Sequence, residues 1–214
     1  EAQRLDELIR ERRPDARSLL DVACGTGKHL AELGDRYPDV AGLDLDDGLL
    51  EVARERLPNV VFHHADMTSF DLGRRFDAVT CLFSSIGYVG AEEKLRAAIE
   101  TMARHLEPGG VLIVEPWLEP RDWKPGHLHL LTVDEADVKI ARASVAGLEG
   151  NISIVDFHYL VVSRAGVEHF TERHAVTLFT REQYEEAFAA AGLAVERDEE
   201  GLFGRGLHIG VKPA

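Results

Sequence analysis

A short glycine-containing segment near the start of the chain has the residue types that hold a nucleoside. The segment Asp21-Val22-Ala23-Cys24-Gly25-Thr26-Gly27 lies between an apolar run and a helical pattern. Gly25 and Gly27 have no side chain to keep the backbone away from a ligand, and the N–H groups at a helix start attract polar ligand groups. Asp44, about 20 residues further on, is placed to accept hydrogen bonds from both ribose hydroxyls. A nucleoside-bearing ligand is therefore predicted.

The sequence of this loop is compatible with two cofactors, a dinucleotide and S-adenosylmethionine. The dinucleotide fingerprint has a third glycine at the position that Leu30 occupies. S-adenosylmethionine has no pyrophosphate, and its cationic amino-acid end suits an acidic residue ahead of the loop, here Asp21. Asp66-Met67 and Pro108-Gly109-Gly110 extend the pattern. The sequence favours S-adenosylmethionine, while a purely structural role for Asp21 and a simple turn at Asp66 stay open as alternatives.

Four segments of the chain carry a more specific likeness. They are Leu19 to Gly27, Phe83 to Tyr88, Val114 to Trp117 and Gly204 to Leu207. Together they resemble class I methyltransferases, and among these the N,N-dimethyltransferases of TDP-linked 3-amino deoxysugars. The resemblance runs from Glu1 to Pro213 and implies methyl transfer from S-adenosylmethionine to the amino group of a nucleotide-linked amino sugar, in antibiotic biosynthesis. By the same resemblance, a tyrosine-bearing segment that closes over the sugar nucleotide would precede Glu1.

The resemblance also assigns roles to individual residues. The residues expected to contact the cofactor are Asp21, Ala23, Gly25, Gly27, Asp44, Leu45, Leu49, Asp66, Met67 and Leu82. Asp66 would accept from the adenine amino group, and Leu82 would lie near the sulfonium. Tyr88 is expected beside the reacting amine, as the catalytic residue, and Trp117 on the wall of the substrate pocket. Arg142, Ser144 and Arg205 are expected at the diphosphate, which a planar guanidinium binds through two hydrogen bonds.

In the methyl transfer implied by this resemblance, the main task of the protein is to position the reactants. A neutral amine displaces the methyl group from sulfur in line, so alignment of nucleophile, carbon and sulfur provides most of the catalysis. We predict that Tyr88 assists by orienting the amine and helping to remove a proton after transfer. The alternatives are methylation of another small amine or hydroxyl, and a non-catalytic cofactor-binding module. Methylation of DNA bases is disfavoured, because Leu82-Phe83-Ser84-Ser85 lacks the Asn/Asp-Pro-Pro-aromatic clamp.

The elements that must position these residues alternate between strand and helix. Apolar runs typical of buried parallel strands lie at 18–23, 40–45, 60–63, 76–82 and 111–114, and helix-period stretches at 28–35, 48–56 and 91–106. A shorter helix is expected before Pro14. Residues 107–110 are predicted to end the last of these helices in a glycine-rich turn. The pattern predicts an α/β fold, a doubly wound Rossmann-like methyltransferase sheet.

The second half of the chain changes character after Glu115. Prolines predict a loop, and the β-branched segments 127–133, 138–145, 152–162 and 167–179 predict a small antiparallel β insert with one wet face after the fifth strand. Thr180 and Gln183 predict a capped helix that ends at Gly192, followed by a closing hairpin of 193–195 with 207–211. We expect a single methyltransferase domain over residues 1–214, with the insert at about 127–179. The insert is a candidate homodimer surface.

The overall composition narrows the classes of partner. The chain has 38 acidic and 24 basic side chains and a net charge of -14, which repels a nucleic-acid backbone. No apolar run is long enough to cross a bilayer, and 2 cysteines are too few for a disulfide framework, so a cytoplasmic protein is expected. The 10 histidines show no zinc-binding spacing, and no metal site is predicted.

Overall fold

The computed structural model describes all residues, 1–214, and they form two compact units. The first unit contains Glu1–Trp117 and Thr180–Ala214, and the second contains Leu118–Phe179. The predicted insert of about 127–179 corresponds to the second unit, which also takes in the proline-containing loop ahead of the first predicted strand. The single domain over 1–214 stays a prediction.

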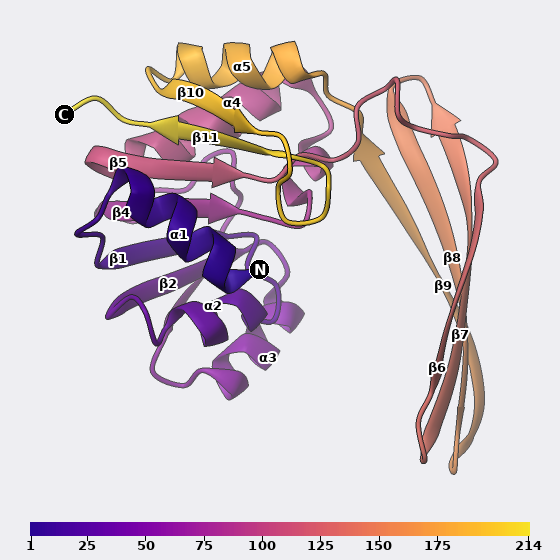
Figure 1. The fold of residues 1–214 in the computed structure, drawn as a ribbon. Coiled ribbons are helices and arrows are strands. Elements are labelled where there is room, and N and C mark those ends of the chain that lie inside the picture. The colour runs from indigo at the N-terminus through magenta and orange to yellow at the C-terminus, as the bar shows by residue number, and fades with distance from the viewer. The chain divides into compact units, whose positions relative to one another are not determined.

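The first unit is built on a seven-stranded sheet with the order β10-β11-β5-β4-β1-β2-β3 (Figure 1). Its strands are β1 (Ser18–Val22), β2 (Asp39–Asp44), β3 (Val61–His64), β4 (Phe76–Cys81), β5 (Leu106–Val114), β10 (Ala194–Asp198) and β11 (Leu207–Val211). Strands β1 to β5 are parallel, and β11 runs antiparallel to both β5 and β10. The doubly wound sheet and the closing hairpin are confirmed. The chain order reverses between β1 and β4, and ligands of such sheets bind beyond the carboxyl ends of the strands at that point.

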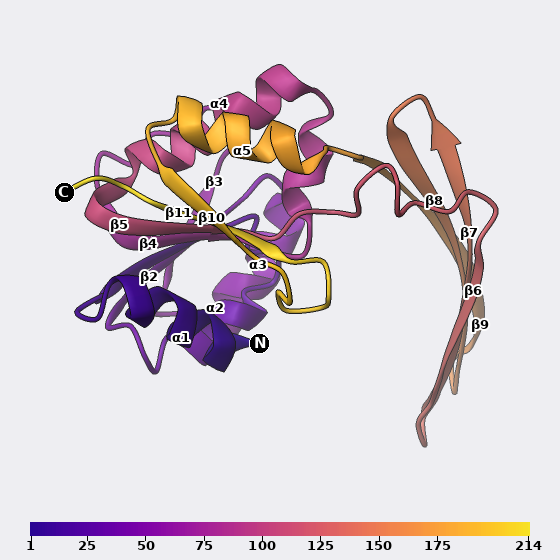
Figure 2. The ribbon, with the colours of Figure 1, turned by 45° about the horizontal axis from the view of Figure 1, so that its top comes forward.

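Helices cover both faces of this sheet. They are α1 (Ala2–Arg12), α2 (Lys28–Leu33), α3 (Asp47–Arg56), α4 (Glu92–Arg104) and α5 (Arg181–Ala190), with a 3₁₀ helix η1 (Ser85–Val89) between β4 and α4. Figures 1 and 2 show α4 and α5 side by side on one face and α1, α2 and α3 on the other. The predicted capping box is present at α5, where Thr180 N donates to Gln183 Oε1 at 2.9 Å and the Thr180 hydroxyl accepts from Gln183 N. No helix is both long enough and apolar enough to cross a bilayer.

Close packing at Gly42 of β2 holds the segment after β1 and the start of β3 against β2. A Cβ atom on Gly42 would lie 2.6 Å from the Phe62 ring and 2.8 Å from Cys24 Sγ. Only glycine therefore lets the loop after β1 and the start of β3 approach β2 this closely. Cys24 N also donates to Leu43 O at 3.0 Å, which continues the pairing of β1 with β2 into the predicted ligand loop.

The prediction of a turn at residues 107–110 is wrong. Helix α4 ends at Arg104, β5 already begins at Leu106, and the pairing with β4 is irregular between Phe76 and Ala78. The reason lies far along the chain. Gly109 N donates to Lys212 O at 2.9 Å, Lys212 N donates to Gly110 O at 2.9 Å, and the Lys212 ammonium donates to two carbonyls at the end of α4 and the start of β5. The segment is thus held in the strand by the C-terminal end of the chain.

The second unit is one antiparallel sheet of β6 (Leu128–Asp134), β7 (Val138–Glu149), β8 (Ile152–Ser163) and β9 (Gly166–Thr177). The predicted antiparallel insert is confirmed. Trp123 Nε1 donates to Gly147 O at 2.9 Å and so ties the proline-containing loop to β7. Because side chains alternate between the faces of a strand, Leu130 and Leu131 on β6 point to opposite faces of this sheet.

Candidate active site

Backbone strain is concentrated at the carboxyl ends of β1 and β4. The non-glycine residues with positive φ are Ala23 (58°), Phe83 (51°) and Ser84 (62°). Ala23 follows β1, and the other two follow β4. A left-handed conformation costs an L-residue roughly 1–2 kcal/mol, and such strain clusters at functional sites. This edge of the sheet, at the reversal of chain order, is therefore the candidate active site.

The predicted ligand loop adopts the geometry expected of its glycines. Gly25 and Gly27 have φ of 53° and 71°. A Cβ atom on Gly25 would meet nothing within 4 Å, whereas one on Gly27 would lie 3.4 Å from Ala53 Cβ in α3. The Arg56 guanidinium donates to the carbonyl and, at 2.9 Å, to the hydroxyl of Thr26, which fixes the loop from the side of α3. Gly27 thus serves the packing, and Gly25 leaves open space for a ligand.

Asp44 joins the end of β2 to this loop. Its Oδ2 accepts from Gly25 N at 2.7 Å and its Oδ1 accepts from Asp46 N at 2.9 Å. Each carboxylate oxygen has a second lone pair, so Asp44 still has acceptors for two ribose hydroxyls. The predicted neighbours Leu45, just before α3, and Leu49, in its first turn, are exposed, and Asp46 caps the helix by accepting from Leu49 N at 3.0 Å. They offer an apolar surface to a flat ring.

Asp21 lies deeper, on β1. Only 2% of its surface is exposed, and its carboxylate accepts from Thr80 Oγ1 at 2.8 Å across the β1–β4 pairing. Burial raises the pKa of Asp21 to about 6, while the attraction of His29 and the Thr80 hydrogen bond lower it and the nearby Asp44 carboxylate raises it further. A buried carboxylate of this kind fits a cationic ligand group.

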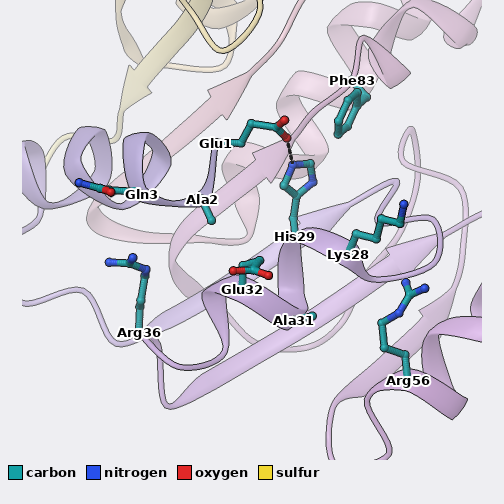
Figure 3. Close-up of a pocket in the computed structure, with 10 residues that line it drawn as sticks. All are labelled: Glu1, Ala2, Gln3, Lys28, His29, Ala31, Glu32, Arg36, Arg56 and Phe83. Carbon is teal, nitrogen blue, oxygen red and sulfur yellow. Dashed lines mark hydrogen bonds and ion pairs between the residues drawn. The ribbon is translucent and has the colours of Figure 1, made fainter.

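His29 is a residue of this region that the sequence analysis did not single out. It lies on α2 directly after the loop, its Nε2 is 3.1 Å from a Glu1 carboxylate oxygen, and its ring centre is 5.0 Å from that of Phe83 (Figure 3). A hollow of about 780 Å³ opens beside it, between the first residues of α1, α2 and Arg56. None of the residues predicted to bind the cofactor lines that hollow. The available signal was the position of His29 only two residues after Gly27.

The third strand and the fourth strand each end in predicted cofactor residues. Asp66 Oδ1 accepts from Thr68 N at 2.8 Å and from Thr68 Oγ1 at 2.7 Å, and both bonds lower the Asp66 pKa. The alternative of a turn at Asp66 is therefore realised, and Oδ2 takes no part in it. Met67 is partly buried beside it, and Leu82 is buried after β4.

The segment after β4 carries the predicted catalytic tyrosine. Tyr88 is 52% exposed and lies on η1, which begins directly after the strained Phe83 and Ser84. Ser84 Oγ donates to Pro116 O at 2.8 Å, so the turn is anchored to the segment after β5.

The predicted substrate residues Trp117 and Arg205 lie together in the first unit. The Arg205 guanidinium carbon is 5.6 Å from the centre of the Trp117 ring, and Arg205 Nη2 donates to Glu115 Oε1 at 2.6 Å. Glu115 belongs to one of the segments that carry the family resemblance, but no motif in the sequence indicates a separate role for it.

Arg142 and Ser144 lie on β7 in the second unit, two residues apart and therefore on one face of the sheet. The Arg142 guanidinium is 4.9 Å from the centre of the Phe157 ring, and its Nε is buried without a hydrogen-bond partner. Diphosphate binding by these two residues stays a prediction.

Comparisons with known proteins decide the family. Residues 19–110 match the family model of a methyltransferase domain. A dTDP-3-amino-3,6-dideoxy-alpha-D-glucopyranose N,N-dimethyltransferase of Streptomyces fradiae is 48% identical over 215 residues, which cover 100% of this chain and 84% of the relative. The chain belongs to the amino-sugar N,N-dimethyltransferases. The resemblance to this family in the sequence, and its class as an S-adenosylmethionine-dependent N-methyltransferase, are confirmed.

Solved structures of such amino-sugar methyltransferases have the same fold. DesVI of Streptomyces venezuelae superposes with a TM-score of 0.96 at 46% identity, covering 100% of this chain and 91% of that one. CalS10, an amino pentose methyltransferase from Micromonospora echinaspora with bound S-adenosylmethionine, has a TM-score of 0.94 at 43% identity, covering 99% and 89%. The predicted cofactor is thereby confirmed, and the acceptors of Asp44, the buried Asp21 carboxylate and the exposed Leu45 and Leu49 fit its ribose, ammonium and adenine.

Proposed function

We propose that this N-methyltransferase methylates the amino group of a TDP-linked amino deoxysugar. The observation that carries the proposal is the 48% identity, over the whole chain, to an enzyme named for a dTDP-3-amino sugar. The strained edge at β1 and β4, with open space beside Gly25, supports ligand binding at this end of the sheet. We also propose a role in antibiotic biosynthesis, because CalS10 is described as involved in calicheamicin biosynthesis, and a cytoplasmic location.

The test is a direct assay of the acceptor. The protein is incubated with S-adenosylmethionine and a panel of TDP-3-amino and TDP-4-amino sugars, and the products are weighed by mass spectrometry. We expect at least one sugar to gain the mass of one or two methylene groups. Turnover of simple amines or hydroxyl compounds with none of the sugars would instead establish the alternative of another small acceptor.

We propose cofactor roles for individual residues of the first unit, on the family resemblance and on the hydrogen bonds and exposure described above. Asp44 accepts from the ribose hydroxyls, Asp21 attracts the ammonium group, and Asp66 accepts from the adenine amino group. The backbone of Ala23, Gly25 and Gly27 lies along the cofactor, Leu45, Leu49 and Met67 pack against its adenine, and Leu82 lies near its sulfur. The bound cofactor supplies an electrophilic methyl group, and the protein supplies its alignment with the amine.

In the first unit we propose Trp117 as a wall of the sugar-nucleotide pocket and Arg205 as a ligand of the diphosphate. The phosphate-binding role expected of Arg142 and Ser144, in the second unit, stays a separate proposal. Arg205 uses one N–H on Glu115, and a guanidinium carries five. Its buried Nε has no partner in the protein, so further N–H groups are left for an anion.

Tyr88 is proposed to assist the transfer without being essential. Replacement by phenylalanine, Tyr88→Phe, keeps the ring and removes only the hydroxyl. We expect kcat to fall by less than about tenfold, because an indispensable proton acceptor contributes about 100-fold or more. The measurement is kcat with saturating cofactor and sugar nucleotide, together with both binding constants. Loss of turnover with unchanged binding constants would show that the hydroxyl is essential.

The second unit is proposed as the surface of a homodimer. Six aliphatic side chains on one face of its sheet are between 38% and 74% exposed: Leu128, Leu130, Val145, Leu160, Val162 and Val167. The register places them on the same side, since Leu128 pairs with Val145, Ala141 with Leu160, and Val162 with Val167. The sheet was predicted to have one solvent-exposed face, and these exposed aliphatic side chains lie together on one face. The same face of a second copy of this chain would bury them, as in a two-fold symmetric dimer.

The dimer prediction is tested by adjacent substitutions on opposite faces. Leu130→Asp puts a charge among the six aliphatic side chains, and we expect it to halve the mass measured by light scattering. Leu131→Asp, one residue further on, faces the other side and should leave the mass unchanged. A monomeric mass for the unchanged protein would refute the proposal, as would a dimer that tolerates Leu130→Asp.

A further inference from the structure

We infer that Glu115 is a positioning residue for methyl transfer, whose single carboxylate holds the strained turn ahead of Tyr88 and the Arg205 guanidinium in one arrangement. The inference rests on the proposed function for its catalytic consequence. The contacts that carry it lie entirely in the first unit.

The position of Glu115 is rigid. It is the first residue after β5, its backbone N donates to Cys81 O at 2.9 Å, and its side chain is 0% exposed. The two carboxylate oxygens have separate partners. Oε2 accepts from Phe83 N at 2.8 Å, and Oε1 accepts from Arg205 Nη2 at 2.6 Å. One buried group therefore links the loop after β4 to the loop between β10 and β11.

The turn that Glu115 holds is the strained one. Phe83 and Ser84 are consecutive left-handed residues, and each such conformation costs roughly 1–2 kcal/mol. A second tether comes from the neighbouring position, where Pro116 O accepts from Ser84 Oγ at 2.8 Å. Residues directly after β5 thus supply two of the bonds that hold the turn, and η1 with Tyr88 begins at the next residue.

The other end of the link is equally well packed. The Arg205 guanidinium lies 5.6 Å from the centre of the Trp117 ring and 5.4 Å from that of Phe203, and Phe203 lies 5.3 Å from Phe83. The two loops therefore meet through an aromatic contact as well as through the carboxylate. Any change in the Arg205 contact to Oε1, such as competition from a phosphate oxygen, acts on the same group that holds Phe83 N.

The cost of the arrangement argues against a purely structural reason for it. Desolvation of a carboxylate costs several kcal/mol, and replacement of a buried ion pair by apolar side chains is often neutral or stabilising. A buried charge at the strained end of the sheet therefore points to precise placement of the two loops as its purpose.

Asp77 is a matched control at the opposite end of the strands, where the amino ends of β1 and β4 lie. Asp77, at the amino end of β4, accepts from Ser18 N at 3.0 Å and from Arg13 Nη2 at 2.9 Å, so it also joins a backbone N–H and an arginine. We compare Glu115→Gln with Asp77→Asn, measuring kcat and KM with a TDP-amino sugar, the cofactor Kd and the melting temperature.

We expect both variants to have a lower melting temperature than the unchanged protein. Only Glu115→Gln should lose kcat, by about 100-fold, because a small displacement of a reacting group has an effect of that size. The cofactor Kd should stay within about threefold, which a general loss of structure would not allow. In the double variant Glu115→Gln/Arg205→Met, the loss should be less than the product of the two single losses, because the side chains act as a pair. An unchanged kcat for Glu115→Gln, or an equal loss in Asp77→Asn, would overturn the inference.

A second readout needs no substrate and separates this inference from the proposed function. Hydrogen exchange of backbone amides, followed by mass spectrometry, should become faster in Glu115→Gln in peptides that cover 83–89 and 201–206, and not in Asp77→Asn. If Glu115→Gln does not fold, Ser84→Ala removes the second tether alone and should speed exchange in 83–89. Unchanged exchange in these peptides would overturn the positioning role, whatever the acceptor proves to be.

Discussion

Asp44→Ala is expected to weaken S-adenosylmethionine binding by about 100-fold or more. Two hydrogen bonds from ribose hydroxyls to a carboxylate are worth about 1.5–3 kcal/mol each, and every 1.4 kcal/mol changes Kd by about tenfold. The substitution also releases Gly25 N, which Asp44 Oδ2 holds at 2.7 Å, so the loop loses its fixed conformation. Both effects act in the same direction. Isothermal titration calorimetry with S-adenosylmethionine measures the result.

The control for Asp44 lies two residues further along the chain. Asp46→Ala removes the cap of α3, which accepts from Leu49 N at 3.0 Å, and should cost about 1 kcal/mol of stability. It leaves the Asp44 carboxylate in place, so the cofactor Kd should change little. A Kd within about threefold of the unchanged protein for Asp44→Ala would show that the ribose is not held here.

The second large effect concerns pH and Asp21. Burial raises the pKa of its carboxylate to about 6, so in the free protein this group becomes neutral as the pH falls through that value. In the role proposed for Asp21, the ammonium group of the cofactor favours the ionised carboxylate, so binding is expected to expel a proton at low pH. Affinity should rise with pH up to about 6 and then level off, with a slope below that point approaching tenfold per pH unit.

Two variants identify the titrating group. Asp21→Asn cannot ionise, so its affinity should be lower by about 10-fold to 100-fold above pH 6, the loss of one charge-assisted hydrogen bond, and should lose the rise through pH 6. His29→Gln removes an attraction that lowers the Asp21 pKa, so the midpoint should move to higher pH. Calorimetry below about pH 7 avoids titration of the cofactor's own amino group. An unchanged profile in Asp21→Asn would place the ammonium elsewhere.

Periodicity and local backbone chemistry determined much of this protein from the sequence alone. The buried parallel strands are continuous apolar runs because helices cover both of their faces, and the helix after Thr180 is capped by residues three apart. The loop at Gly25 and Gly27, with Asp44 after the next strand, was recognisable because only a few residue types suit a backbone that approaches a ligand closely. These properties depend on neighbours within one or two elements.

The tertiary structure decided the features that depend on pairing between distant segments. Glu115 and Arg205 are 90 residues apart, and only the antiparallel return of β11 beside β5 brings the β10–β11 loop to the end of β5. The hydrogen bonds of Gly109 and Gly110 with the backbone of Lys212 also depend on the pairing of β11 with β5. Neither the buried Glu115 carboxylate nor the extension of β5 leaves a periodic pattern in the local sequence. Both are stabilised by burial and by strand pairing with distant segments. That is why the sequence determined the fold and the loop at Gly25 and Gly27, and only the tertiary structure revealed the link between the strained turn and Arg205.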